Sequence, residues 1–262
     1  MSPSAIRASK PWISPPGKFS LVLAGLVGGF INVMAGGGSV IMVPVMIFLG
    51  VPGPIANGTN RLPILIQNFT ACITYFRHGL PQSRMIVSLS LCAIPGAVLG
   101  ALVGVRLSAE SFNHILAAVM IAVLLLMILE PRADTQNTHR TISRQRLIAG
   151  HGLMMAAGFW GGFIQIGMGF ILLPIMTRVL GFTLVAANVH KVFIIFTYTA
   201  SALLVFGSQV PLLWWVGGIM AIGNGVGGWL GARLTIAGGE RIVKIAVVIA
   251  IAVMVIKLIW FT

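Results

Sequence analysis

Long apolar runs separated by short polar stretches divide the chain into segments of membrane length. They lie at 18–34, 39–50, 54–76, 85–105, 111–129, 147–166, 169–181, 183–206, 212–233 and 240–261. A helix needs about 20 apolar residues to cross a bilayer core about 30 Å thick, and most of these runs approach that length. A transmembrane β-barrel would instead alternate apolar and polar residues over stretches of about ten. The pattern therefore predicts an all-α integral membrane protein.

The same pattern occurs twice along the chain. Gly25-Leu26-Val27-Gly28-Gly29-Phe30-Ile31-Asn32 returns as Gly158-Phe159-Trp160-Gly161-Gly162-Phe163-Ile164-Gln165, Pro44-Val45-Met46 as Pro174-Ile175-Met176, and Ala56-Asn57 as Ala187-Asn188. We therefore predict two homologous membrane repeats, 18–129 and 147–262, with about eight hydrophobic segments in total. A flexible tail over 1–17 and a cytoplasmic linker over 130–146 complete the organisation. Paired repeats with interrupted segments are typical of secondary transporters.

Glycine clusters interrupt the first segment of each repeat. They are Ala35-Gly36-Gly37-Gly38 and Gly167-Met168-Gly169. A continuous helix over 18–50 would be about 50 Å long, too long for the bilayer core, so a break is expected. The piece over 39–50 is then either the tail of a broken span or the returning arm of a re-entrant hairpin.

These two alternatives predict different topologies. Broken spans give parallel repeats with the N-terminus inside, and they place Arg77 and Arg233 on opposite sides of the membrane. Hairpins give inverted repeats with both termini outside, and they place these two arginines on the same side. The excess of basic residues on the linker side is larger for hairpins, so the positive-inside rule favours them.

Glycines also recur at every fourth position later in each repeat. They are Gly96, Gly100 and Gly104, and then Gly223, Gly227 and Gly231, followed by Arg106 and Arg233 respectively. Such stripes of small residues let membrane helices approach closely, so we interpret them as packing surfaces.

The breaks and the polar faces of the following helices are the candidate site. A broken helix frees backbone N–H groups at membrane depth, and a helix beginning near Ser39 would direct them at an anion. The candidate substrate-binding residues are Gly37, Gly38, Ser39, Asn57, Asn60, Arg61, Gln67, Gly167, Gly169, Asn188, Lys191 and Tyr198. Arg61 and Lys191 have the alternative of snorkelling to the headgroups. His190 is a candidate proton carrier, with a satisfied interior histidine as the alternative.

Composition and charge narrow the function. Hydrophobic residues make up 58% of the chain, and 17 basic residues against four acids give a net charge of +13. Topology accounts for much of this excess, and the positive interior potential favours anionic cargo. Basic residues scattered among membrane spans do not form a nucleic-acid-binding surface. The acids, Glu110, Glu130, Asp134 and Glu240, lie at predicted loops or helix ends, so carboxylate-based ion binding in the membrane is not expected.

Enzymatic motifs are missing from the sequence. It contains no Walker loop, no metal-binding set of His and Cys, and no nucleophile motif. We therefore expect no cofactor, no metal and no enzymatic activity, and we interpret Cys72 and Cys92 as small core residues. Val33-Met34-Ala35 is similar to a signal-peptidase site, but the internal copy of residues 25–32 predicts that this segment stays in the mature fold.

The residues of the first break resemble a known family. Gly25, Gly28, Ala35-Gly36-Gly37-Gly38, Pro44, Gly50 and Ala56-Asn57 are similar to the TauE/SafE family of sulfite exporters, also described as DUF81-type permeases. The similarity extends over about 18–262. It implies a permease of the bacterial cytoplasmic membrane for small sulfur-containing anions such as sulfite or organosulfonates.

We therefore expect a multi-pass secondary transporter in the bacterial inner membrane that moves a small anion by alternating access. Its partners would be the anionic substrate and the lipid bilayer. Two other classes stay open: a membrane-embedded enzyme acting on lipid, and a non-transporting sensor or assembly protein.

Overall fold

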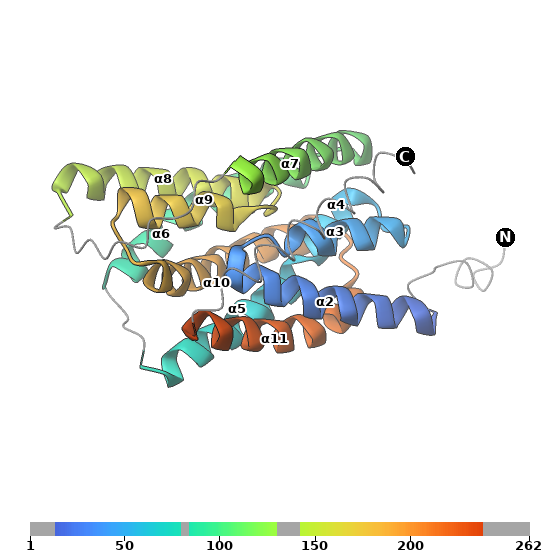
Figure 1. Cartoon of the computed structure of the whole chain (residues 1–262). Coiled ribbons are helices and arrows are strands. Elements are labelled where there is room, and N and C mark those ends of the chain that lie inside the picture. Colours follow the sequence, from blue (N-terminus) through green and yellow to red (C-terminus); the bar gives the residue numbers. More distant parts are fainter. Residues whose placement is uncertain (1–13, 80–83, 130–141, 238–262) are drawn as a thin grey trace.

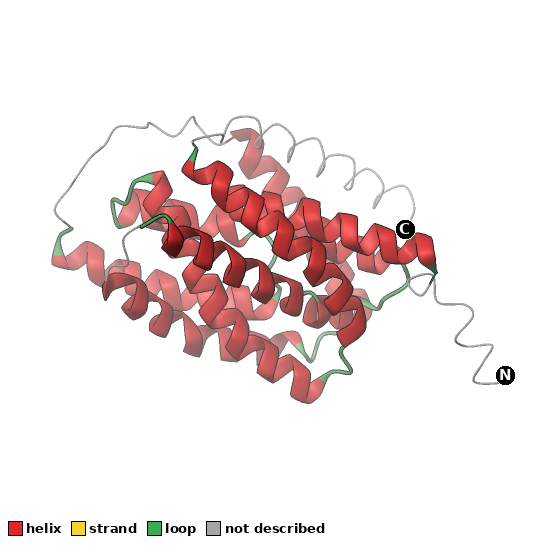
Figure 2. Cartoon of the chain, turned by 90° about the horizontal axis from the view of Figure 1, so that it is seen from below, coloured by secondary structure: helices red, strands yellow, loops and turns green. Residues whose placement is uncertain are grey.

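The computed structural model describes residues 14–79, 84–129 and 142–237, and the regular structure within them is entirely helical (Figures 1 and 2). The helices are α2 (Pro15–Ala35), α3 (Ser39–Phe48), α4 (Gly53–Thr59), α5 (Arg61–Arg77), α6 (Arg84–Gly104), α7 (Ala109–Leu129), α8 (Arg144–Phe163), α9 (Met168–Pro174) with the π-helical turn η2 (Ile175–Val179), α10 (Leu184–Gln209) and α11 (Trp214–Ile236). The predicted all-α class is confirmed. The predicted segment over 240–261, and most of the tail and linker, lie outside the described residues, so the count of eight segments stays a prediction.

Three of the described helices are long and apolar enough to cross a membrane. They are Pro15–Met34, Arg84–Gly104 and Leu184–Gln209. Shorter apolar helices are Ser39–Phe48, Ala109–Val123 and Met168–Val179. The chain is a multi-pass membrane protein by these lengths and compositions.

Two helices begin about one turn earlier than the apolar pattern predicts. Ser14 caps α2 by accepting a hydrogen bond from the Gly17 amide at 3.2 Å, and a proline occupies the first turn. Ser143 caps α8 by accepting from the Arg146 amide at 3.4 Å, so the helix includes the last residues of the predicted linker. The apolar pattern misses both helix starts, because a serine cap and a polar first turn mark them instead.

Proline divides the polar helix in the first half of the chain. The single helix predicted over 54–76 is two helices, α4 and α5, that meet at Asn60. Pro63 has no N–H to donate to the Thr59 carbonyl, so the regular ladder is interrupted here. Another proline, Pro174, ends α9, and the chain continues from it into the π-helical turn.

The first break forms a helical hairpin. Gly36 ends α2 in the left-handed conformation, with φ 77°, and its amide donates to the Asn32 carbonyl at 2.8 Å. α3 then runs back along α2 (Figure 1). Gly38, just before α3, packs on Asn32 and Gly28, and Met42, one turn later in α3, packs on Gly28, which lies one turn before Asn32 in α2. The returning-arm alternative is therefore the correct one for 39–50.

The second break has the same form. After α8 the chain passes through Gln165 and Gly167, which both have positive φ angles. α9 and η2 return alongside α8, so that Leu180 packs on Gly150 near the start of that helix. Both halves of the chain thus begin with a hairpin of one long and one short helix.

The glycine stripes join each hairpin to a helix of the other half. Any side chain on these glycines would overlap a backbone carbonyl of the facing helix. Gly223, Gly227 and Gly231 of α11 face the carbonyls of Val22, Leu26 and Phe30 in α2, and Gly96, Gly100 and Gly104 of α6 face those of Met155, Phe159 and Phe163 in α8. The predicted packing role is confirmed. Because the numbers rise together, each pair of helices is parallel.

The two hairpins enter the bundle from opposite ends. α5 runs parallel to α11, because Thr59 lies by Gly217 and Gln67 by Gly228. Phe206 contacts both Arg61 at the start of α5 and Gly104 at the end of α6, so α5 and α6 are antiparallel. α2 follows the direction of α5, and α8 follows that of α6. The long helices of the two hairpins therefore point in opposite directions, as Figure 1 shows.

One end of the bundle collects most of the exposed basic residues. His151 Nε2 and Ser88 Oγ lie 3.1 Å apart and join the starts of α6 and α8 at this end. The described residues here are Arg77, Arg84, Arg144, Arg146, Arg178 and Arg233, whereas Lys18 and Arg106 lie at the other end. Arg77 and Arg233 line one pocket, so they lie on the same side, as the inverted arrangement requires.

Candidate functional site

The two helix breaks meet inside the bundle. The Gly169 amide donates a hydrogen bond to the Gly36 carbonyl at 3.2 Å. A side chain at Gly36 would overlap the backbone of Gly169, so the contact depends on a glycine at position 36. Sequence analysis predicted breaks at corresponding places, and the structure brings them into direct contact.

The two breaks differ in the short helices that follow them. α3 has ten residues and begins at Ser39, which is buried together with Gly37 and Gly38. The Val40 and Ile41 amides in its first turn donate to the Gly37 and Gly38 carbonyls at 3.1 and 3.0 Å. At the second break, α9 has seven residues and the Gly169 amide is already bonded to Gly36. The Gly169 amide thus already has an acceptor in the other break, and the matching site expected at Gly167 and Gly169 stays a prediction.

Arg61 lies wholly inside the bundle, at the C-terminal end of α8. Its side chain is 0% exposed. Nη1 donates to the Gly161 carbonyl at 3.1 Å and to Gln165 Oε1 at 3.0 Å, and Nη2 donates to the Gly162 carbonyl. The guanidinium carbon also lies 4.2 Å from the ring centroid of Phe206. These contacts hold the charge in the interior, so Arg61 does not snorkel.

Lys191 has a similar place at the end of α2. Its side chain is 0% exposed, and Nζ donates to the Val33 carbonyl at 2.8 Å and to the Asn32 carbonyl at 3.3 Å. Nζ also donates to Asn188 Oδ1 at 2.7 Å. The snorkelling alternative is wrong for Lys191 too. Each cation thus lies at the C-terminal end of a broken helix, where the helix dipole favours positive charge.

The buried amide side chains connect the two hairpins to α4 and α5. Asn57 Nδ2 donates to the Phe163 carbonyl at 2.9 Å, and Gln67 Oε1 accepts from Asn32 Nδ2 at 3.2 Å. Asn57 Oδ1, Asn60 Oδ1 and Gln67 Nε2 are buried and have no hydrogen-bond partner. A buried polar atom without a partner costs about 1–3 kcal/mol. These atoms are therefore positioned to bind a polar guest.

Of the remaining candidate residues, two lie beside the buried cations. Tyr198 packs its ring against Gly161, beside Arg61, whereas Asn188 belongs to the Lys191 cluster. Gly167 starts α9 in the left-handed conformation, with φ 73°. His190 is buried, and its Nδ1 lies 2.7 Å from the Ala186 carbonyl, which requires Nδ1 to be the donor. Its ring centroid lies 4.1 Å from that of Phe182.

Sequence analysis missed three polar residues of this interior. Asn32 and Gln165 end the two copies of the repeated motif, and Thr199 lies one residue beyond Tyr198. Gln165 has a positive φ of 61°, uncommon for a residue with a side chain, and Nε2 donates to Thr199 Oγ1 at 2.7 Å. The available signal was a polar residue at the same motif position in both repeats.

Carboxylates are missing from this interior in the part of the chain that the structure describes. Glu110 is the one acidic residue in the described part of the chain, and it is exposed at the start of α7. The same part of the chain holds no group of three His, Cys, Asp or Glu side chains that could bind a metal ion. Cys72 and Cys92 are free thiols, each half-buried. The interior is thus polar and cationic.

Opposed helical hairpins around buried cations, in a chain with several apolar helices, define a multi-pass membrane transport protein. The family described as "Sulfite exporter TauE/SafE" matches residues 21–258, and the chain belongs to this family.

Several relatives are similar to the chain over most of their length. "Probable membrane transporter protein ORF9" of Sinorhizobium sp is 31% identical over 233 residues, which cover 88% of each chain. A "Probable membrane transporter protein" of Haemophilus influenzae is 28% identical over 240 residues, covering 92% of this chain and 93% of the relative. "Probable membrane transporter protein YfcA" of Escherichia coli K12 is 27% identical over 248 residues, covering 92% and 88%. No solved structure matches the chain.

Proposed function

We propose that this protein is a secondary transporter that moves a small anion, sulfite or an organosulfonate, across the bacterial inner membrane by alternating access. The family description names a sulfite exporter, and the relatives are named as membrane transporters. Both support transport as the class of function, and the family description alone supports sulfur oxyanions as the class of substrate.

The observation that carries this proposal is the charge balance around Arg61. Its guanidinium is fully buried, and its hydrogen-bond acceptors are two carbonyl oxygens and one amide oxygen. Burying an ion costs several kcal/mol unless an opposite charge compensates it. Arg61 Nε has no hydrogen-bond partner, so one N–H donor stays available. A planar guanidinium fits the oxygens of a sulfite or sulfonate group well.

The other candidate residues complete the proposed site. Gln67 Nε2 offers a buried donor to an oxyanion, whereas the unpaired oxygens of Asn57 and Asn60 would accept from a protonated oxygen of the substrate. Lys191 with Asn188 adds a second positive group, and Tyr198 bounds the Arg61 side. The N-terminus of α3, at Gly37, Gly38 and Ser39, would contribute dipole potential, and Gly167 and Gly169 at the second break would complete the site.

Alternating access would use the contact between the breaks. The Gly36–Gly169 contact joins the tips of two hairpins that enter from opposite ends. Moving one hairpin relative to the other would open the site to one side and then to the other, as in transporters with inverted repeats. The anion would lower the cost of the buried charge while it crosses.

Flux of radiolabelled sulfite into liposomes tests the proposal. We expect the wild-type protein to carry sulfite above the rate of protein-free liposomes, and Arg61→Gln to reduce the flux at least about tenfold, as loss of a charge-assisted hydrogen bond implies. Arg106→Gln removes an exposed arginine at the end of the bundle and should keep wild-type flux. Wild-type flux in a folded Arg61→Gln variant would remove Arg61 from the site. No flux of sulfite or of any organosulfonate by the wild type would overturn the proposed substrate class.

A further inference from the structure

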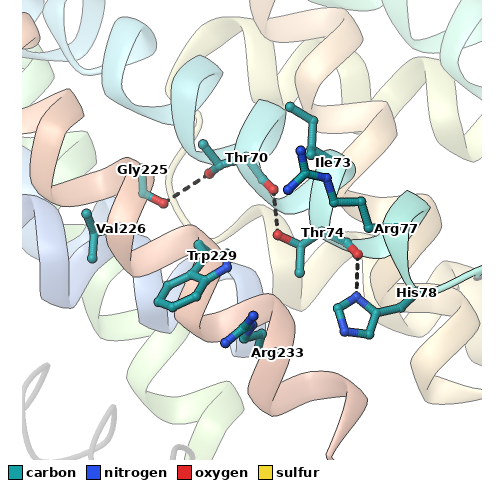
Figure 3. A pocket seen from close by; sticks show the side chains of 9 residues that line it. All are labelled: Thr70, Ile73, Thr74, Arg77, His78, Gly225, Val226, Trp229 and Arg233. Atoms are coloured by element: carbon teal, nitrogen blue, oxygen red, sulfur yellow. Dashed lines mark hydrogen bonds between the residues drawn. The ribbon is translucent and has the colours of Figure 1, made fainter.

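A second cationic site lies away from the helix breaks, in a pocket between α5 and α11 (Figure 3). Its volume is about 370 Å³, and it opens on the surface of the bundle near the end that collects the basic residues. None of the candidate substrate-binding residues lines it. The pocket therefore needs an explanation of its own.

Two arginines reach this pocket because two parallel helices end side by side. Arg77 belongs to the last turn of α5 and Arg233 to the last turn of α11. Both are exposed, and the Arg233 guanidinium carbon lies 4.3 Å from the ring centroid of Trp229. Glu110, the one acid in the described part of the chain, lies at the start of α7 and does not line the pocket. The mouth of the pocket is thus positively charged.

The wall of the pocket is apolar and faces outward. Trp229 is 39% exposed and Val226 is 48% exposed, and Ile73 lines the α5 side. Ile222, one turn before Val226 on the same helix, is 66% exposed. Large exposed apolar side chains on a membrane helix face lipid. The pocket therefore opens toward the acyl chains as well as toward the headgroups.

The polar side chains in the pocket are engaged with the backbone. Thr70 Oγ1 donates to the Gly225 carbonyl at 3.1 Å, and Thr74 Oγ1 donates to the Thr70 carbonyl at 2.8 Å. His78 Nδ1 lies 2.8 Å from the Thr74 carbonyl, as Figure 3 shows. The arginines are thus the charged groups available to recognise an occupant, above an apolar wall.

We propose that this pocket binds an anionic phospholipid. Its phosphate would lie between Arg77 and Arg233, and one acyl chain would follow Ile73, Val226 and Trp229. Charge complementarity selects an anionic headgroup, and the apolar wall distinguishes a lipid from a small hydrated anion. Basic pockets between membrane helices at the cytoplasmic side suit this chemistry. This inference does not rest on the transport proposal.

Lipid retention by the purified protein tests the site. The full chain is purified from detergent micelles containing equal amounts of phosphatidylglycerol and phosphatidylcholine, and the retained lipids are measured by mass spectrometry. We expect wild type to retain phosphatidylglycerol preferentially, and Arg77→Gln or Arg233→Gln to reduce that preference about fivefold each. Arg106→Gln, which removes an exposed arginine at the opposite end, should keep the wild-type preference.

Two further measurements distinguish the occupants. In the wild type, added salt should release phosphatidylglycerol and leave phosphatidylcholine unchanged, because salt screens the headgroup contact. Free sulfite or inorganic phosphate at millimolar concentration should not displace the lipid. Displacement by either ion would replace the lipid proposal with a small-anion vestibule. An unchanged lipid preference in both glutamine variants, or an equal fall in Arg106→Gln, would overturn it.

Discussion

Arg61 and Lys191 each donate hydrogen bonds to carbonyl oxygens at the C-terminal end of a broken helix. A break leaves the last carbonyl groups of a helix without backbone donors. A buried cation can donate hydrogen bonds to these carbonyls, and the helix dipole favours its positive charge there. In the proposed mechanism, the same cation would also offer its charge to a substrate anion. Structural support for the hairpin and anion recognition can thus be functions of the same side chain.

Lys191→Gln separates these two functions. We expect a rise in the sulfite concentration needed for half-maximal flux of about ten- to hundredfold, since losing a charge-assisted hydrogen bond costs roughly 1.5–3 kcal/mol. Lys191→Arg keeps the charge and should lie closer to wild type. Concentration dependence of flux in liposomes measures the effect, with thermal melting to establish that each variant is folded. If Lys191→Gln melts lower but transports with wild-type affinity, Lys191 only caps α2.

His190→Gln tests the candidate proton carrier. His190 is the one buried histidine among the described residues, and it precedes Lys191 on α10. If it carries a coupling proton, its removal should flatten the pH dependence of net sulfite flux, while exchange of sulfite across the liposome membrane keeps the wild-type rate. His151→Gln, at the half-buried start of α8, is the matched control. A wild-type pH profile in His190→Gln would assign His190 a structural role, through contacts such as those with the Ala186 carbonyl and Phe182.

At the scale of elements, each hairpin depends on close approach of backbone to backbone. Gly38 lies against the Gly28 carbonyl, so α3 returns along α2 at a distance that a side chain at this position would prevent. The stripe glycines of α6 and α11 hold the long arm of each hairpin in the same way. Small residues thus specify both the turn at the break and the helix that supports it.

Gly38→Ala should therefore lower both stability and transport. The added methyl would overlap the Gly28 carbonyl, and overpacking of this kind costs about 1–3 kcal/mol. The melting temperature and the sulfite flux of the purified protein measure the two effects. Gly218→Ala is the control, because its added methyl meets open space within α11 and a helical alanine is about 1 kcal/mol more favourable than glycine. Equal melting temperatures for the two variants would contradict the importance of the close contact at Gly38.

At the scale of the whole molecule, the opposed hairpins and the distribution of charge define an orientation. The described exposed basic residues lie mainly at the end formed by the start of α8 and the end of α11. The positive-inside rule assigns that end to the cytoplasm. The start of α2 and the end of α10 would then face the periplasm.

Cysteine labelling tests this orientation. In a background with Cys72→Ala and Cys92→Ala, Ser208→Cys at the exposed end of α10 should react with a membrane-impermeant maleimide in intact spheroplasts. Gln145→Cys, in the first turn of α8, should react only after the membrane is opened. Labelling of Gln145→Cys in intact spheroplasts, with protection of Ser208→Cys, would reverse the assigned orientation.

Local patterns in the sequence determined the helices and the breaks. Apolar runs located the described helices because membrane burial requires them, and glycines at every fourth position identified the faces of α6 and α11 that pack closely. The polar residues Arg61 and Lys191 were recognisable because charge at membrane depth is costly. Two helix starts were misplaced because serine caps set them, and the division at Asn60 was missed because a single proline sets it.

Tertiary structure alone decided how these parts combine. Whether α3 continues or returns depends on the packing of Gly38 and Met42 on Gly28, which no local pattern encodes. Only the bundle shows that Arg61 and Lys191 reach carbonyls a hundred or more residues away instead of the headgroups. It also shows that the Gly169 amide is bonded to the other break. Sequence patterns report burial and backbone conformation, whereas the partner of each buried polar group depends on contacts between distant segments.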